Sequence, residues 1–227
     1  LILNHVLPNA AGHILAAAIV SAPAGVLLAR IMVPELADRK AEKIDYSSSL
    51  RYDSAIDAVS KGTQDGMMVA TNIAAILIVM VALVALFNMI LGVFPHVGGQ
   101  PLTIERILGT IFTPLAWLIG IPWKEAATGG WILGVKMVLT EFVAFLRLAT
   151  IPVADMTERT RIILTYATCG FANIGSVGIS VAGFSALMPS RRKEILGLVW
   201  KALLSGFLAT CLSAAIVGAL PNAVYGL

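Results

Sequence analysis

The chain of 227 residues is strongly apolar: 58% of its residues are hydrophobic, 13% are charged, and the mean hydropathy is +0.89. A soluble domain carries about 45–50% apolar and about 25% charged residues, so the composition excludes an ordinary soluble protein. It predicts an all-α polytopic membrane protein. The net charge of +3 gives no reason to expect a nucleic-acid partner, and two cysteines with three histidines predict neither a disulfide framework nor a metal cluster.

Three stretches are apolar and long enough to cross a lipid bilayer, since a transmembrane helix needs about 20 such residues. The expected transmembrane helices lie within 1–34, 67–94 and 193–220. The second is longer than a perpendicular crossing needs, so we expect it to tilt. Residues 35–66 carry charges of both signs and an amphipathic pattern, which predicts a cytoplasmic loop with a short interfacial helix.

Residues 103–122 begin with Thr103 and Glu105, a pair typical of a helix start, and contain Pro114 half-way along. We expect an oblique or external helix here, although the length also permits a crossing.

Two further segments are too polar for simple spans. Residues 129–152 contain two cations and an acid, and residues 159–188 contain several glycines and the stretch "TCGFANIGSVGI". Loops rich in lysine and arginine are usually cytoplasmic, which places 35–66 and 189–194 inside and the C-terminus outside. Both ends of 129–152 then lie outside, so this segment is predicted to be a re-entrant helical hairpin in a plasma or inner membrane.

The hairpin would turn near residues 139–141 and bring Glu141 to about the bilayer midplane. An acid there costs about 2.5–3.5 kcal/mol and is functional by default. The glycines of 159–188 permit a mid-membrane broken helix at the same depth, where unpaired backbone groups are tolerated only beside a cavity. Facing broken helices are typical of secondary transporters. The candidate substrate-binding residues are Glu141, Phe171, Asn173 and Ser176, a set that suits a neutral ligand rich in hydroxyl groups.

Other interpretations of these polar residues stay open. Asn173 and Ser176 could instead hold neighbouring helices together. Lys136 precedes Glu141 by five residues, which is poor spacing for a helical ion pair, so we expect the two side chains on different faces.

Four ordered stretches resemble the concentrative nucleoside transporters. They are "SAPAGVLLARIMVPE" at 21–35, "GVKMVLTEFVAFLRL" at 134–148, "MTERTR" at 156–161 and "TCGFANIGSVGI" at 168–179. The resemblance implies nucleoside uptake driven by a Na⁺ or H⁺ gradient, with no cofactor, by a homotrimer that works as an elevator. It implies that Glu141, Asn173 and Ser176 bind ribose hydroxyls and that Phe171 contacts the nucleoside. Residues 1–34 would belong to the moving transport region and 67–94 to the fixed scaffold.

The sequence also departs from that family's pattern. Thr140 stands where the family usually has Asn, and Phe145 stands where it usually has Tyr. The second hairpin motif of the family, Gly-Gln-Thr-Glu, does not occur. We therefore expect a C-terminal portion of a transporter, beginning in mid-membrane, that carries the ribose half of the site and no recognisable sodium ligands.

Two other function classes compete with transport. A channel would use Glu141 as a ring charge in its pore, and a non-transporting membrane subunit would need no complete site. An enzyme is not indicated, because the sequence has no HExxH, no GxSxG and no paired intramembrane aspartates.

Overall fold

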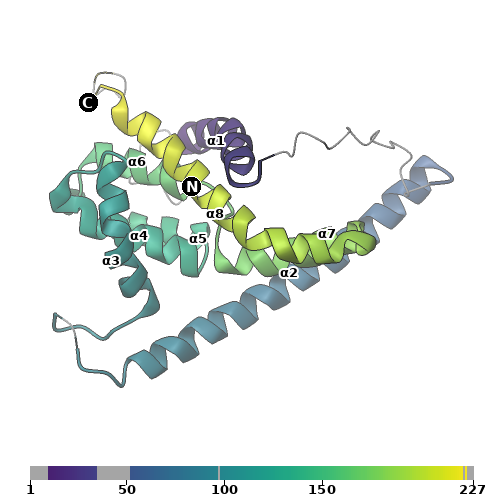
Figure 1. Ribbon diagram of the computed structural model, residues 1–227, viewed down its shortest axis with the longest axis horizontal. Helices are drawn as coiled ribbons and strands as arrows, with labels where there is room; N and C mark the ends of the chain where they lie inside the picture. The colour runs from purple at the N-terminus through teal and green to yellow at the C-terminus, as the bar shows by residue number, and fades with distance from the viewer. Residues whose placement is uncertain (1–9, 35–51, 97, 222, 224–227) are drawn as a thin grey trace.

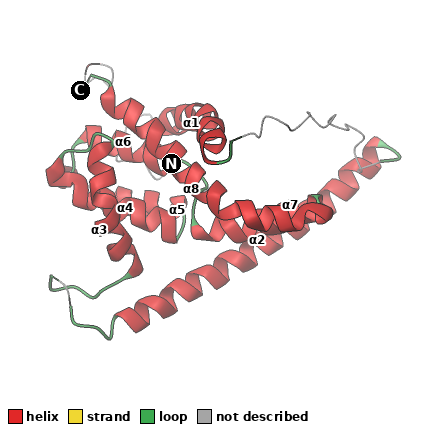
Figure 2. Cartoon of the chain, viewed as in Figure 1, coloured by secondary structure: helices red, strands yellow, loops and turns green. Residues whose placement is uncertain are grey.

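The computed structural model describes residues 10–34, 52–96, 98–221 and 223, and these residues form helices and no strand (Figures 1 and 2). The all-helical fold class predicted from composition is therefore confirmed. In chain order the helices are α1 (Ala10–Met32), α2 (Ala55–Leu91), α3 (Ile104–Leu118), α4 (Trp123–Val138), α5 (Glu141–Thr150), α6 (Glu158–Thr168), α7 (Ile174–Leu187) and α8 (Arg192–Ala219), with the 3-10 turns η2 (Val153–Asp155) and η3 (Pro189–Arg191).

Helices α1, α2 and α8 are the described helices long and apolar enough to cross a membrane. They differ in how far the rest of the chain covers them. Half of the apolar window of α8 is buried, against 11% in α1 and 6% in α2. Helix α8 is thus covered on one side by the rest of the chain, whereas α2 runs along the edge of the molecule, as Figure 1 shows.

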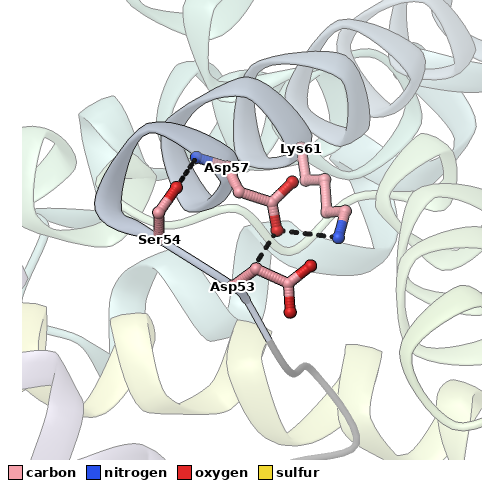
Figure 3. A network of polar contacts seen from close by, with 4 residues as sticks. All are labelled: Asp53, Ser54, Asp57 and Lys61. Carbon is pink, nitrogen blue, oxygen red and sulfur yellow. Dashed lines mark hydrogen bonds and ion pairs between the residues drawn. The ribbon is translucent and has the colours of Figure 1, made fainter.

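Helix α2 begins twelve residues before the predicted transmembrane segment. Ser54 caps it by accepting a hydrogen bond from the N–H of Asp57 at 3.1 Å, and Lys61 donates to the Asp57 carboxylate at 2.8 Å (Figure 3). These contacts start a helix of 37 residues, about 55 Å long, so 55–66 are not the separate interfacial helix that we expected. Residues 35–51 of that predicted loop lie outside the described residues.

Helix α3 starts where the sequence predicts it. The Thr103 side chain accepts a hydrogen bond from the N–H of Arg106 at 3.3 Å, and Pro114 lies inside the continuous helix. Its 15 residues are fewer than the about 20 that a crossing needs. An oblique or external position relative to the membrane stays a prediction.

Helices α3 and α4 pack backbone against backbone, since glycines form the contact. A Cβ atom added to Gly109 would lie 2.9 Å from the Cα of Trp131, and one added to Gly134 would lie 2.6 Å from the carbonyl oxygen of Glu105. No side chain fits in so little space, so these glycines fix α4 against α3.

Two interruptions of the chain give the fold its functional geometry. Only residues 139 and 140 separate α4 from α5, and residues 169–173 separate α6 from α7. The break within 159–188 is therefore present, and the turn within 129–152 lies at Leu139 and Thr140. The helix pair extends from Trp123 to Thr150, starting six residues before the predicted boundary. That this pair re-enters the membrane stays a prediction.

A buried arginine fixes the far end of this helix pair. Arg161 of α6 is 1% exposed and donates to the carbonyl oxygens of Leu148, Ile151 and Pro152 at 3.3, 2.8 and 2.7 Å. The Leu148 and Pro152 oxygens also accept from the backbone N–H groups of Ile151 and Asp155, at 3.4 and 3.1 Å. The Ile151 oxygen lies just beyond the last turn of α5, where helical N–H donors run out, and Arg161 supplies its donor. The cation therefore completes the end of α5 and joins α6 to it.

Candidate functional site

The first half of the site is the beginning of α5. Thr140 precedes the helix in an extended conformation, and its hydroxyl accepts a hydrogen bond from the N–H of Val143 at 3.2 Å. Glu141 is the first residue of the helix, where a carboxylate interacts favourably with the positive end of the helix dipole. The turn at residues 139–140 thus presents an acid at a helix N-terminus.

The second half of the site is the beginning of α7. The Asn173 Oδ1 atom accepts a hydrogen bond from the N–H of Ser176 at 2.8 Å, and the Ser176 Oγ atom accepts one from the N–H of Asn173 at 3.2 Å. The Ser176 hydroxyl also donates to the carbonyl oxygen of Asn173 at 2.6 Å. This capping box leaves Asn173 fully buried and Ser176 5% exposed.

The two halves meet at one hydrogen bond. The Asn173 Nδ2 atom donates to the Glu141 Oε2 atom at 3.2 Å, across 32 residues of sequence. The N-termini of α5 and α7 are therefore adjacent, and the acid and the amide lie between them. Of the four predicted site residues, the structure brings Glu141, Asn173 and Ser176 together.

The remaining hydrogen-bonding capacity defines what this cluster can bind. An amide nitrogen has two N–H groups, and Asn173 uses one on Glu141. A hydroxyl oxygen has two lone pairs, and Ser176 uses one on the N–H of Asn173. With the second carboxylate oxygen of Glu141, the site offers acceptors and one donor close together. Adjacent hydroxyl groups on a ligand would match this set.

Phe171 lies in the break between α6 and α7 and is 53% exposed, while its neighbour Ala172 is 6% exposed. The position fits an apolar wall beside the cluster. The structure does not place its side chain in the hydrogen-bonded group formed by the other three residues.

Two further residues next to the site were not predicted to act there. The Lys136 Nζ atom donates to the carbonyl oxygen of Ala167 at 2.7 Å and to the Thr210 Oγ1 atom at 2.6 Å. Its hydrogen bonds therefore go to α6 and α8, while Glu141 lies on α5, so the two residues do not share a helix and their spacing along one does not apply. A lysine in an apolar stretch indicates a special role even from sequence. Thr210 gives no such indication, because threonine is common in membrane helices.

No group of three or more His, Cys, Asp or Glu side chains in the described ranges is placed to hold a metal ion.

Comparison with known proteins identifies the family. The family described as Na⁺ dependent nucleoside transporter C-terminus matches residues 13–218. The chain belongs to this family. The family resemblance carried by the four sequence stretches is thus confirmed. The matched proteins are integral membrane transporters, in agreement with the prediction that the chain is not an enzyme.

Individual relatives support this assignment. The chain is 41% identical over 209 residues to the uncharacterized transporter YutK of Bacillus subtilis, covering 91% of this chain and 52% of that protein. It is 36% identical over 211 residues to the nucleoside permease NupC of Helicobacter pylori, covering 91% of this chain and 50% of that one. The chain thus spans about half the length of these relatives.

A solved structure also matches. The structure of CNTnw in an inward-facing substrate-bound state shares 39% identity with this chain at a TM-score of 0.72, over 91% of this chain and 50% of that one. At this level of sequence identity the similarity indicates a shared family as well as a shared fold.

Proposed function

We propose that this chain contributes the ribose-binding half of the site in a transporter that takes up nucleosides with an ion gradient. The observation that carries the proposal is the hydrogen bond between Asn173 Nδ2 and Glu141 Oε2 at 3.2 Å, where the N-termini of α5 and α7 meet. A ribose presents adjacent 2′ and 3′ hydroxyl groups, which can each donate to the carboxylate and accept from the amide.

Each of the predicted residues takes a role in this proposal. Glu141 accepts hydrogen bonds from ribose hydroxyls, and Asn173 donates its second N–H to one of them. Ser176 holds Asn173 in place through the capping box and offers one lone pair. Phe171, exposed beside the cluster, supplies an apolar contact to the nucleoside.

The coupling ion is proposed to be Na⁺ or H⁺, and the family description favours Na⁺. Replacement of external Na⁺ by choline distinguishes the two ions, because Na⁺-coupled uptake is lost while H⁺-coupled uptake persists.

We further propose an elevator movement in a homotrimer, with α2 in the scaffold. The small buried share of α2 supports this role, since its apolar surface is left for contact with lipid or other protein. In the same arrangement α4 and α5 form a re-entrant hairpin from the outer side, α3 lies oblique or external, and the C-terminus is outside, in a plasma or inner membrane. Cross-linking of the purified full-length protein tests the trimer.

Uptake of labelled uridine and adenosine by cells that express the full-length protein tests the proposed function. Saturable, gradient-dependent uptake is expected, and Glu141→Gln should reduce it strongly. Glu158→Gln is the matched control, because Glu158 is an exposed acid at the start of α6 and its loss should leave uptake unchanged. Ion conductance without saturable uptake would replace this function by that of a channel.

A further inference from the structure

The break between α6 and α7 leaves a carbonyl group at the end of α6 that needs a partner. In a continuous helix the N–H of Phe171 would bind the carbonyl oxygen of Ala167, four residues earlier. Phe171 lies in the break instead, and Ala167 is fully buried. A buried carbonyl without a hydrogen bond is strongly unfavourable, so a group from elsewhere in the chain must supply the donor.

Lys136 supplies this donor from a different helix. Its ammonium group lies 2.7 Å from the Ala167 oxygen, and the side chain is 0% exposed. A cation at a helix C-terminus also interacts favourably with the helix dipole, and a charged donor makes a stronger hydrogen bond than a neutral one. The last turn of α4 is therefore tied to the last turn of α6.

Helix α8 completes the environment of the ammonium group. The Thr210 hydroxyl donates to the carbonyl oxygen of Phe207 at 2.9 Å, so its lone pairs are available to accept from Lys136, at 2.6 Å. The Phe207 ring centroid lies 5.4 Å from the ammonium nitrogen, within the range of a cation–π contact. One buried cation thus joins three helices.

The position of this junction relates it to the site. Lys136 lies three residues before the 139–140 turn that presents Glu141, and Ala167 lies two residues before the break that ends at Asn173. The 139–140 turn and the 169–173 break therefore both begin within one helical turn of this junction. The separation of Glu141 from Asn173 therefore depends on how firmly the ends of α4 and α6 are held together.

We propose that Lys136 is a positioning residue for ribose recognition: by holding the broken end of α6 against α4 and α8, it sets the Asn173 amide against Glu141. The inference rests on the proposed function for its effect on substrate. The junction itself, which joins α4, α6 and α8 through Lys136, does not depend on any substrate.

The test compares Lys136→Met with Lys124→Met in the full-length protein. Methionine keeps the unbranched stem of lysine, one atom shorter, and removes the donors, and Lys124 is an exposed lysine on the same helix. The readout is the ratio of the KM for 2′,3′-dideoxyuridine to the KM for uridine, which measures recognition of the ribose hydroxyls. Lys136→Met should lower this ratio roughly tenfold, the effect of about one lost hydrogen bond, and Lys124→Met should leave it unchanged.

A purely structural role predicts a different result. Lys136→Met would then reduce only the maximal rate, through fewer folded transporters, and an unchanged KM ratio would overturn the proposal. If Lys136→Met does not accumulate, Thr210→Val replaces it, since valine keeps the shape of threonine and removes the acceptor. The KM ratio should fall in the same direction, and an unchanged ratio would likewise refute the positioning role.

A second readout separates this inference from the proposed function. Cys169 lies in the break, half-buried, with its Sγ atom 3.5 Å from the carbonyl oxygen of Ile14. Loosening of the α6 end by Thr210→Val, which keeps the positive charge of Lys136 near the thiol, should raise the rate of alkylation of Cys169 by N-ethylmaleimide in the purified protein. An unchanged alkylation rate contradicts the junction, whereas a raised rate in a protein that takes up no nucleoside contradicts only the proposed function.

Discussion

Replacement of Asn173 by aspartate places a second carboxylate at the contact between the two helix N-termini. The side chains are nearly the same size, so the new oxygen would take the place of Nδ2, 3.2 Å from the Glu141 Oε2 atom. Two unit charges at this distance repel by about 5 kcal/mol at an effective dielectric constant of about 20, and by about 1.3 kcal/mol in water. Even the smaller repulsion energy corresponds to a nearly tenfold loss of affinity.

We therefore expect Asn173→Asp to raise the KM for uridine at least about tenfold at neutral pH. Two carboxylates this close share a proton when one is available, so acidification should restore part of the affinity. Uptake measured from pH 5.5 to 8.5 checks this, with wild-type protein as the reference.

The double variant Asn173→Asp, Glu141→Gln is the decisive control, because it removes one of the two charges. Its uptake should be weak and should show no gain of affinity as the pH falls. A single variant Asn173→Asp with wild-type KM across the pH range would refute the contact between Glu141 and Asn173 in the working protein.

Three further substitutions test the surroundings of the site. In Gly170→Ala the added methyl group would overlap the Thr210 Cγ2 atom, so the KM for uridine should rise. Gly183→Ala is the control, because the space around its Cβ position is open, and it should behave as wild type. Equal KM values for the two variants would contradict close packing of the 169–173 break against α8. Ser176→Ala removes the reciprocal half of the capping box and leaves the buried N–H of Asn173 without its acceptor. The start of α7 should lose about 1 kcal/mol, seen as faster hydrogen exchange of that turn, and unchanged exchange would argue against the box. Arg161→Met removes the donor to the Ile151 carbonyl and one of two donors to the Leu148 and Pro152 carbonyls, at about 1–3 kcal/mol for a buried group left unpaired. Its melting temperature should fall clearly below that of the exposed control Arg192→Met, and equal values would show that the arginine is dispensable.

The sequence predicts the parts of the fold that depend on local chemistry. Glycine and asparagine in an apolar run predict the break at residues 169–173, because such residues favour turns and helix caps over helix interiors. A hydroxyl residue followed by an acid predicts the start of α3 at Thr103 in the same way. Length and hydropathy predict the three long helices.

Other features depend on packing between distant segments and could not be predicted. Lys136 contacts Thr210 across 74 residues of sequence, and nothing local to either residue indicates the pairing. The continuity of α2 through residues 55–66 was missed because charged residues there are also typical of a solvated loop. A good N-cap at Ser54 and the i,i+4 pair of Asp57 and Lys61 favour helix in spite of those charges.

Nucleoside binding to the purified full-length protein, measured by calorimetry, tests the central claim most directly. Uridine should bind at least about tenfold more tightly than 2′,3′-dideoxyuridine, since loss of the ribose hydroxyls leaves polar groups of the site unpaired. In Glu141→Gln the two ligands should bind with similar, weak affinity. Equal affinity of the wild-type protein for both nucleosides would contradict the assignment of Glu141 and Asn173 to the ribose.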